Sequence, residues 1–549
     1  MNIYFCGIGG VGLGPLAEVA LDAGHTVQGS EPNDTHITQQ LTERGVVINK
    51  KQQGMFLQAC HSEKPIDWFV YTSAIPDDHP ELALARMLGI KTSKRDELLV
   101  HILKEKNLKL IAVAGTHGKT TTTAMLVWAF AQLGIPVSYS VGTTMSFAPS
   151  GHYEDSDYFV YECDEFDRNF LQFHPHVSLV TSIDYDHSDT YSTPDDYLAA
   201  FRQFASQSEH TIVWEHDASL IGAPASSWTL GDHDIAPITL PGQHNRLNAS
   251  LVVKTIEHLG LPGDSIAALN TFPGVDRRFE EIITNLYSDY GHHPTEIAAT
   301  LQLARELNDD VVLVYQPHQN IRQHELRTQY DDCFERASEV YWLPTYLTRE
   351  DPSLPILTPQ ELAEYITNYD AVRFAEMDQT LWENIQKARD RGALVLVMGA
   401  GSIDDWLRDT IAIKHVASVI LMDDAGNFVL QQRDERPDIS SSGKVSTFGG
   451  AVEADDASLR SAAVRELREE TNLEFKEDDL AYFKLHFSVD EWDTPIIRAY
   501  YILSGVVIDN LEIYEGQGFV TVSPNELNKF PLSLSARTAI TEYIHPAMV

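Results

Sequence analysis

Val113-Ala114-Gly115-Thr116-His117-Gly118-Lys119-Thr120 is the stretch that decides the fold of the central part of this 549-residue chain. It ends an apolar run, Leu108–Val113, and precedes a helical pattern that begins at Thr121. A glycine turn between a strand and a helix lets backbone N–H groups surround a phosphate, while a lysine neutralises the phosphate and a hydroxyl holds magnesium. The stretch therefore predicts a nucleotide site of the P-loop type, with Val113 standing where the full pattern has its first glycine.

Two apolar runs in the same region end in acidic residues. The run Tyr158–Tyr161 leads into Glu162-Cys163-Asp164-Glu165, and Val177–Ile183 leads into Asp184-Tyr185-Asp186-His187-Ser188-Asp189. Neighbouring parallel strands end at one edge of a sheet, where carboxylates and an imidazole can hold one or two Mg²⁺ ions. Ordinary acidic loops are the alternative interpretation, and the adjacent phosphate loop makes it the weaker one.

The chain as a whole is organised as three α/β units followed by an α+β unit. Strand-like and helix-like runs alternate up to about residue 409, which is typical of parallel sheets. The C-terminal part places Ser418–Met422 and Phe428–Gln432 on either side of the turn Asp423–Asn427, which is a hairpin signal. We therefore expect four domains, at residues 1–105, 106–276, 277–412 and 413–549. The other strands that we expect lie at Asn2–Cys6, His25–Gln28, Val46–Asn49, Trp68–Thr72, Val311–Tyr315 and Leu394–Met398.

A second glycine loop, Gly7-Ile8-Gly9-Gly10-Val11-Gly12, follows the first strand and opens a helix. Such a loop lets the backbone approach a phosphate at a helix N-terminus. Taken alone, it is about as compatible with a structural tight turn as with a binding loop. Ser73 lies near the expected end of a later strand, on the ligand-binding edge of such a sheet, and is a further candidate.

Three carboxylates share one face of a charged helix that we expect over Ala457–Thr471. They stand at i, i+3 and i+4 after the pair Gly449-Gly450, as Glu466, Glu469 and Glu470. A divalent cation with oxygen ligands would relieve their mutual repulsion, and Arg465 is placed to orient Glu469. The alternative is a solvated acidic helix with exposed ion pairs.

The composition excludes several classes of protein. The formal net charge is −40, which disfavours nucleic acid and anionic membranes as partners. No run of 18 or more apolar residues appears, and the N-terminal run lacks the basic region of a signal peptide. The scattered cysteines predict a reducing, cytoplasmic location and neither a disulfide framework nor a zinc site. They are Cys6, Cys60, Cys163 and Cys333.

The motifs of residues 1–410 together resemble those of the Mur ligase family, and most closely those of its alanine-adding members. The matching segments occur in the family's order, which makes the resemblance highly specific. They are Gly7–Gly12, Gly115–Thr122, Glu162–Asp167, Asp186-His187, Asp189–Tyr191, Leu240–Asn245, Asn248-Ala249, Gly274–Phe279, Asp289–Glu296 and Gln316–His318.

The resemblance implies a fold and an activity. The fold is a Rossmann-like UDP-binding domain, a P-loop ATPase-like central domain and a Rossmann-like C-terminal domain. The activity is ATP- and Mg²⁺-dependent ligation of L-alanine, or a related acceptor, to UDP-N-acetylmuramate through an acyl phosphate in peptidoglycan synthesis.

The resemblance also implies roles for individual residues. Lys119 and His187 are the catalytic residues, and Thr120, Glu162 and His187 hold magnesium. The ATP-binding set is Gly115, Thr116, His117, Gly118, Lys119, Thr120, Thr121, Asn245, Asn248 and Asp289. The UDP-binding set is Gly9, Gly10, Val11, Gly12 and Ser73, and the acceptor-binding set is His292, His318 and Arg322.

Four departures from the family pattern concern specificity rather than the ATP chemistry. Gln319 follows His318 where alanine-adding members usually have an arginine, and this change concerns the amino-acid specificity. Ser288 stands where an aspartate is usual, and Phe166 replaces a serine. The stretch His210–Leu240 is shorter than usual.

The C-terminal glutamates resemble the Nudix box, in which such residues bind Mg²⁺ for hydrolysis of a nucleoside diphosphate compound. The resemblance gives Glu466 a catalytic role and makes Glu515 a further possible ligand. The segment between Gly450 and Arg465 is one residue longer than usual, so that Asp456 only roughly replaces an early glutamate. Asn472 replaces the glycine after the helix, a mild change because asparagine also adopts the left-handed conformation.

Three alternatives to alanine addition remain at this point. The first is a recycling ligase that attaches a preformed peptide to the same sugar; His318 and the run Tyr290–His293 favour alanine addition over it. The second is a ligase-like nucleotide sensor with a regulatory Nudix module. A Nudix enzyme on an inactive ligase scaffold is least favoured, because Lys119, Glu162 and His187 are all present.

Overall fold

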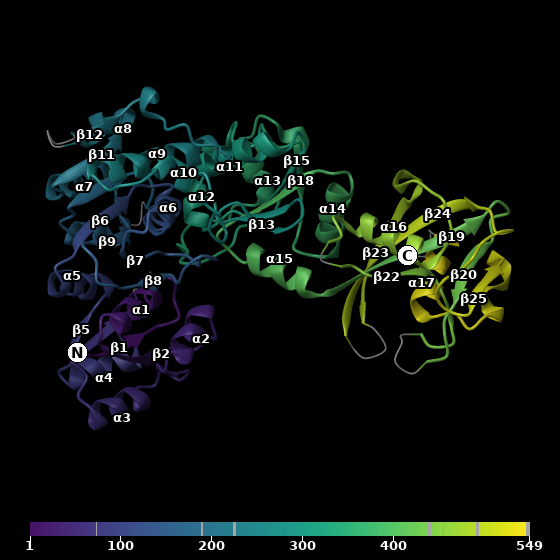
Figure 1. The fold of residues 1–549 in the computed structure, drawn as a ribbon, viewed down its shortest axis with the longest axis horizontal. Coiled ribbons are helices and arrows are strands. Elements are labelled where there is room, and N and C mark those ends of the chain that lie inside the picture. Colours follow the sequence, from purple (N-terminus) through teal and green to yellow (C-terminus); the bar gives the residue numbers. More distant parts are fainter. Residues whose placement is uncertain are drawn as a thin grey trace. The chain divides into compact units, whose positions relative to one another are not determined.

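A computed structural model describes residues 1–72, 74–187, 190–222, 227–436, 441–453, 455–489 and 494–544 of the chain. The chain divides into two compact units, Met1–Glu280 and Glu281–Val549. Each unit contains two β-sheets with helices packed around them (Figure 1).

The first sheet is parallel and has the strand order β3-β2-β1-β4-β5. Its strands are β1 (Asn2–Cys6), β2 (Thr26–Ser30), β3 (Val47–Asn49), β4 (Trp68–Tyr71) and β5 (Lys91–Ser93). The helices around it are α1 (Gly14–Asp22), α2 (His36–Glu43), α3 (Met55–Glu63), α4 (Pro80–Met87) and α5 (Arg95–Lys106). Strand β1 is buried along its whole length, as expected for the centre of a parallel sheet.

The second sheet has the order β12-β11-β10-β6-β9-β7-β8, and only the edge pair β7–β8 is antiparallel among the pairs described. Its strands are β6 (Lys109–Ala114), β7 (Ser138–Ser140), β8 (Gly151–His152), β9 (Tyr158–Glu162), β10 (Val177–Val180), β11 (His210–Trp214) and β12 (Trp228–Leu230). The helices are α6 (Lys119–Gln132), α7 (Pro194–Gln207), α8 (Glu215–Ile221), α9 (Gln243–His258) and α10 (Ser265–Leu269). Strands β6, β9 and β10 are adjacent, so their carboxyl ends meet at one edge.

The third sheet has the order β13-β14-β18-β15-β16-β17. Its strands are β13 (Glu280–Ile283), β14 (Leu286–Asp289), β15 (Val311–Tyr315), β16 (Glu339–Trp342), β17 (Val372–Phe374) and β18 (Leu394–Met398). The helices are α11 (Pro294–Leu307), α12 (Asn320–Leu326), α13 (Pro359–Ala363), α14 (Gln379–Asp390) and α15 (Ile403–Ala412). Strands β15 and β18 are fully buried apolar runs, which explains why their bounds agree with those expected from the sequence.

The fourth sheet is mixed and has the order β21-β20-β19-β24-β23, with β22 on β19 and β25 on β20. Its strands are β19 (Lys414–Asp423), β20 (Phe428–Gln432), β21 (Val445–Ser446), β22 (Phe448–Ala451), β23 (Ala481–Val489), β24 (Pro495–Val506) and β25 (Gly518–Val522). Helices α16 (Leu459–Glu470) and α17 (Leu534–Ile544) pack against it. The apolar core on the α16 side continues into the third sheet and helix α14, so these two parts of the second unit share one core.

Two strands differ from the expected bounds by three residues or more at one end, and the other expected strands agree to within two residues. Strand β10 ends at Val180 and not at Ile183, because the next residues turn toward the glycine loop: Thr181 donates to the carbonyl of His117. Strand β19 begins at Lys414 and not at Ser418, because it pairs in parallel with β24 along its whole length. A pairing partner more than 80 residues away leaves no local signal in the sequence.

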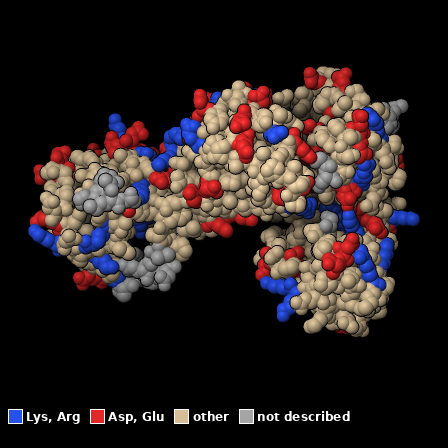
Figure 2. Space-filling model, turned by 180° about the vertical axis from the view of Figure 1, so that it is seen from behind, with Lys and Arg blue, Asp and Glu red and all other residues tan. Residues whose placement is uncertain are grey.

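Acidic and basic side chains are interspersed on the face of the molecule shown in Figure 2. None of the helices in the described part of the chain has the length and apolar character that crossing a membrane requires.

Candidate functional site

The stretch Val113–Thr120 forms a tight loop between β6 and α6. Gly115 has φ +132° and Gly118 has φ +83°, conformations that favour glycine. A Cβ atom on Gly115 would lie 2.3 Å from Thr181 Oγ1, and one on Gly118 would lie 2.8 Å from Asn248 Oδ1. The loop therefore needs both glycines. It leads directly into the N-terminus of helix α6, as expected for a phosphate-binding loop.

Lys119 lies at the centre of this loop. Its Nζ donates to the carbonyls of Gly115 (2.6 Å) and Thr116 (3.1 Å) and is 2.9 Å from Glu165 Oε2. Burial alone would lower the pKa of Lys119, but the carboxylate of Glu165, with Asp164 behind it, raises the pKa above its usual value. Burial would likewise raise the pKa of Glu165, and Lys119 and His187 lower it instead. Both shifts describe an ion pair between the fully buried Glu165 and the half-buried Lys119, which keeps the lysine charged.

Thr120 and Glu162 come together as a pair of oxygen ligands. Thr120 Oγ1 donates to Glu162 Oε1 at 2.6 Å, and the other carboxylate oxygen of Glu162 accepts from the Gly142 N–H at 2.9 Å. A hydroxyl and a carboxylate are the donor types that Mg²⁺ prefers. The two residues predicted from the sequence to share a metal ion are therefore neighbours, and their chemistry fits that ion.

A second group of possible metal ligands lies next to Lys119. The ligand atoms of Asp164, Glu165 and His187 are all within 4.8 Å of one another. His187 Nε2 is 3.5 Å from Glu165 Oε1. Burial would lower the pKa of His187, but its hydrogen bond to Glu165 and the charge of Asp186 raise it. Glu165 contacts both Lys119 and His187, although the sequence analysis had singled out only Glu162 and His187 from these acidic loops.

The two asparagines assigned to ATP both lie on helix α9. Asn248 is buried with its side chain against Gly118. Asn245 is one turn earlier and donates through Nδ2 to the Pro241 carbonyl. Helix α9 thus places Asn248 directly at the glycine loop Gly115–Gly118. Thr121, also assigned to ATP, lies in the first turn of α6.

Arg95 is a residue that the sequence analysis missed. Its Nη1 donates to the Gly12 carbonyl at 3.4 Å, and its Nη2 is 3.9 Å from Asp164 Oδ2. The side chain therefore links the first glycine loop to the acidic group beside Lys119. No motif marks this arginine, because its role depends on two loops that are distant in sequence.

The first glycine loop is held by side chains of its own domain. The Gly9 N–H donates to Glu31 Oε2 at 3.2 Å, and a Cβ on Gly9 would lie 2.9 Å from Thr35 Oγ1. Gly10 and Gly12 continue the loop, and Val11 is 62% exposed at its tip. Close packing thus accounts for part of the glycine pattern. Ser73 lies outside the described residues.

The residues assigned to the third domain gather at the carboxyl edge of its sheet. Asp289 ends β14 and accepts from the Gly291 N–H at 2.7 Å. The rings of His292 and His318 are 5.5 Å apart, and His318 stacks on Tyr346. Arg322 lies in α12, the helix that follows. These four predicted residues therefore belong to one edge of one sheet.

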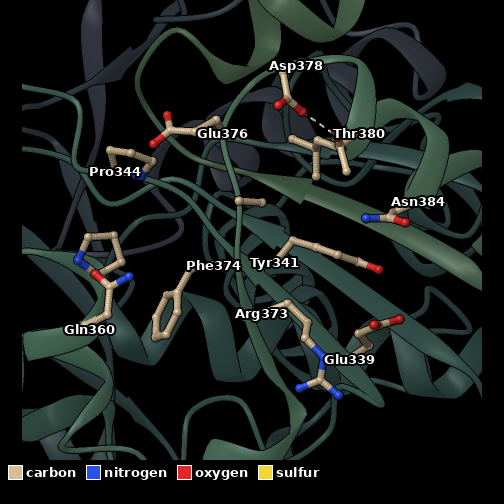
Figure 3. Close-up of a pocket in the computed structure, with 13 residues that line it drawn as sticks. Glu339, Tyr341, Pro344, Gln360, Arg373, Phe374, Glu376, Asp378, Thr380 and Asn384 are labelled. Carbon is tan, nitrogen blue, oxygen red and sulfur yellow. Dashed lines mark hydrogen bonds between the residues drawn. The ribbon is translucent and has the colours of Figure 1, made fainter. Parts of the chain in front are cut away.

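A cavity of about 590 Å³ lies elsewhere in the second unit, where β16 and β17 end and α14 begins (Figure 3). Tyr341, Arg373, Phe374 and Glu376 are among the side chains around it. None of the residues predicted from the sequence lines this cavity.

The glutamates of the fourth domain take different positions around Gly449-Gly450. Glu470 is 2% exposed and accepts from the Gly449 N–H (2.8 Å) and from Gln431 Nε2 (2.9 Å). A Cβ on Gly450 would lie 2.4 Å from Glu466 Oε2, so the glycine makes room for that carboxylate. Burial raises the pKa of Glu470 to about 7. Within the described residues no lysine or arginine is ion-paired with Glu470, so a cation fits the charge at this position.

Arg465 organises the outer side of this group. Its guanidinium donates hydrogen bonds to Asp456 Oδ2 (2.8 Å), Glu466 Oε1 (2.9 Å) and Glu469 Oε2 (3.2 Å). The contact with Glu469 was expected from the sequence, and Asp456 adds a second anchor. Glu469, with 55% of its side chain exposed, thus faces the arginine and solvent. The Glu515 segment lies nearby, since its carbonyl accepts from Gln431 Nε2 at 3.3 Å.

Helix α14 of the third domain contacts the start of helix α16. The backbone N–H of Arg460 donates to Asp390 Oδ1 at 3.3 Å, and Tyr501 donates to Asp390 Oδ2 at 2.6 Å. Arg389 donates to the Ala457 carbonyl at 3.0 Å. A carboxylate from one domain therefore caps the glutamate-bearing helix of the next, where a negative charge is favoured.

We expect Asp390→Ala to loosen the first turn of α16. The change removes the acceptor of Arg460 N–H and leaves the Tyr501 hydroxyl buried without this partner, at a cost of about 1–3 kcal/mol. Hydrogen exchange should then be faster for the amides of residues 460–464. Glu383→Gln is the matched control, because Glu383 accepts from Tyr482 across the same junction without contacting α16. Equal exchange in the two variants would contradict the cap.

Comparison with known families accounts for nearly the whole chain. Residues 2–107 match the description "Mur ligase family, catalytic domain", 113–231 match "Mur ligase middle domain" and 277–401 match "Mur ligase, glutamate ligase domain". Residues 413–542 match "NUDIX domain".

Individual relatives agree with these matches. The chain is 30% identical to the UDP-N-acetylmuramate–L-alanine ligase of Thermosynechococcus vestitus, over 77% of this chain and 98% of the relative. It is 32% identical to the enzyme of that name from Solibacter usitatus, over 73% and 93%. Among solved structures, UDP-N-acetylmuramate-alanine ligase from Thermotoga maritima is similar with a TM-score of 0.59 and 25% identity, over 75% of this chain and 98% of that one. A murein peptide ligase from Psychrobacter arcticus shares the fold at a TM-score of 0.52 and 22% identity, over 75% and 98%.

Proposed function

This chain belongs to the Mur ligase family and carries a NUDIX domain, and from that premise we propose that it joins L-alanine to UDP-N-acetylmuramate with ATP and Mg²⁺. The proposal assigns the UDP end of the substrate to residues 1–105, ATP to 106–276 and the acceptor to 277–412. The observation that carries it is the position of Lys119 within the glycine loop, half-buried and next in sequence to Thr120, which pairs with Glu162. The relatives named above are the source of the substrate assignment.

The first half of the reaction needs a held and neutralised phosphoryl group. A carboxylate oxygen of the sugar substrate attacks the γ-phosphorus of ATP, the bond to ADP breaks, and an acyl phosphate forms. Lys119 neutralises charge on the phosphates, while backbone N–H groups of residues 115–118 surround them. Thr120 and Glu162 would hold one Mg²⁺ ion and His187 a second, and the bound ions would supply further positive charge against the phosphate oxygens.

The second half needs an amine held against the acyl carbon. The amine nitrogen attacks that carbon, an amide bond forms, and inorganic phosphate leaves. His318 and Arg322 are assigned to the acceptor, since a carboxylate is bound best by a cationic partner. No protein nucleophile takes part in either half.

The ligation is tested by ADP release from ATP with UDP-N-acetylmuramate. The acceptor panel contains L-alanine, glycine, L-serine and a murein-type tripeptide. Release that depends on L-alanine supports the proposal, and release that depends on the tripeptide alone would support the recycling ligase instead. ATP turnover without any amide product would favour a nucleotide sensor.

For the NUDIX domain we propose Mg²⁺-dependent hydrolysis of a nucleoside diphosphate compound. Glu466 and Glu470 beside Gly449-Gly450 are the groups that would hold the metal. The buried carboxylate of Glu470, which has no basic partner among the described residues, supports this assignment. The identity of the nucleoside is the question that a substrate panel would answer.

The acceptor site leads to a prediction for Gln319→Arg. Gln319 offers only a neutral amide where alanine-adding relatives usually have a guanidinium, and a charge-assisted hydrogen bond contributes about 1.5–3 kcal/mol. We therefore expect the arginine to lower KM for L-alanine by roughly 10-fold. KM for L-alanine, glycine and L-serine is measured in both proteins, with KM for ATP as the internal control. An unchanged alanine KM would show that position 319 points away from the acceptor carboxylate.

A further inference from the structure

Three side chains of different metal-ligating types meet in the first domain, apart from the ATP and NUDIX sites. Cys6 ends strand β1, His79 is the N-cap residue of helix α4, and Glu81 lies in the first turn of that helix. Their ligand atoms lie within 4.8 Å of one another, and Cys6 Sγ is 3.9 Å from His79 Nδ1. A tetrahedral zinc ion with one sulfur and one nitrogen ligand separates those two atoms by about 3.6 Å.

The negative charge of the Cys6, His79 and Glu81 group favours a bound cation. Cys6 and Glu81 are both 0% exposed, and His79 is partly exposed. In the part of the chain that the structure describes, no lysine or arginine forms an ion pair with Glu81. Burying a carboxylate without a full opposite charge is costly, and the N-terminus of α4 supplies only a partial one. A thiolate and a carboxylate together carry two negative charges, which one divalent ion balances.

Other side chains already hold the ligands in place. Tyr4 donates to Glu81 Oε1 at 2.8 Å and Ser30 donates to Oε2 at 2.5 Å. Gln52 Nε2 is 3.6 Å from Cys6 Sγ. Each carboxylate oxygen keeps a lone pair after accepting one hydrogen bond, so Glu81 remains able to bind a metal. Groups that fix the orientation of ligands in this way are typical of metal sites.

We propose that Cys6, His79 and Glu81 bind one Zn²⁺ ion, which ties the start of the first glycine loop to helix α4. Sulfur, nitrogen and oxygen ligands together favour zinc over magnesium or calcium. The fourth position is left for water on the exposed side of His79. The thiolate is the form of cysteine that binds a metal, so zinc binding must displace the proton of the Cys6 thiol. The three ligands belong to none of the residue sets assigned to UDP, ATP, the acceptor or the NUDIX metal.

This inference differs from the sequence-based expectation of no zinc site. Zinc sites are recognised in sequences by closely spaced cysteines and histidines. Here Cys6 and His79 are 73 positions apart, and only the pairing of β1 with β4 and the position of α4 bring them together. The signal therefore exists only in the folded structure.

The test uses the full chain with zinc and cobalt as probes. Protein stripped with a chelator is titrated with Zn²⁺ against a chromogenic competitor, and separately with Co²⁺, whose thiolate complexes have a charge-transfer absorption band. We expect one tight ion per chain and a thiolate band. Cys6→Ser should remove the band, and His79→Ala should weaken zinc binding by at least about 10-fold.

Two controls separate this site from binding elsewhere on an acidic chain. Cys60→Ser removes the other thiol of the first domain and should change neither titration. Glu165→Gln alters the group beside Lys119 and should also leave the thiolate band intact. Circular dichroism checks that Cys6→Ser is folded, and the partly exposed His79 provides a second, milder variant. A wild-type chain without the cobalt–thiolate band, or with equal zinc affinity in His79→Ala, would overturn the proposal.

Discussion

Lys119→Ala should lower kcat/KM for ligation by at least about 10²-fold, because it removes the charge that neutralises the transferring phosphoryl group. The same lysine is in contact with two loop carbonyls and with Glu165. Its loss therefore affects both the ATP phosphates and the acidic group beside them. The measurement is ADP release with saturating L-alanine and UDP-N-acetylmuramate, and Lys94→Ala, which breaks an exposed ion pair with Asp167, is the control.

The variant must be separated from simple unfolding. Removing Lys119 leaves Glu165, which is fully buried, without its main partner, and breaking a buried pair from one side costs about 3–5 kcal/mol. The double variant Lys119→Met with Glu165→Gln removes both charges and should regain much of that stability. Stability that returns without activity would support the catalytic role. Near-normal turnover in Lys119→Ala would contradict it.

The sequence was most informative where function depends on local backbone. The loop Gly115–Gly118 needs two glycines in unusual conformations and a following lysine, so its motif carries both the geometry and the charge. The strands β15 and β18 were found with their bounds because a buried parallel strand is a continuous apolar run. Such features depend on residues that are consecutive in the chain, so a single sequence is enough to predict them.

The sequence was least informative where residues meet from distant elements. Arg95 joins Gly12 to Asp164, and Asp390 caps the helix that begins at Leu459, yet neither residue has a motif. Glu165 lies in a run of acidic residues, and the sequence does not distinguish it from its neighbours. Only the structure does so, through its contact with Lys119. The same holds for strand β19, whose first four residues are ordered by β24. These contacts depend on tertiary packing, which periodicity and spacing do not report.

Glu470→Gln should reduce metal-dependent hydrolysis by the NUDIX domain by roughly 10²-fold or more, since even losing a partner of a metal ligand costs 10–100-fold. Glu470 is the most buried of the three glutamates, and Gly449 N–H and Gln431 fix its two oxygens. Glutamine has nearly the same shape but neither the charge nor two acceptor oxygens, so the variant tests metal binding rather than packing. Ligation should be unchanged, because Lys119, Thr120 and Glu162 lie in another domain of the chain.

The assay for this variant is phosphate release from a panel of nucleoside diphosphate compounds with Mg²⁺. Glu477→Gln, at an exposed position of the same domain, is the matched control and should be fully active. Glu469→Gln should lose less than Glu470→Gln, because Glu469 faces Arg465 and solvent. If the wild-type protein hydrolyses none of these compounds, the affinity for Mn²⁺ is measured instead, in the wild-type protein and in Glu470→Gln. Equal Mn²⁺ affinity in the two proteins would show that Glu470 is a structural residue and that the metal site must be sought at other carboxylates.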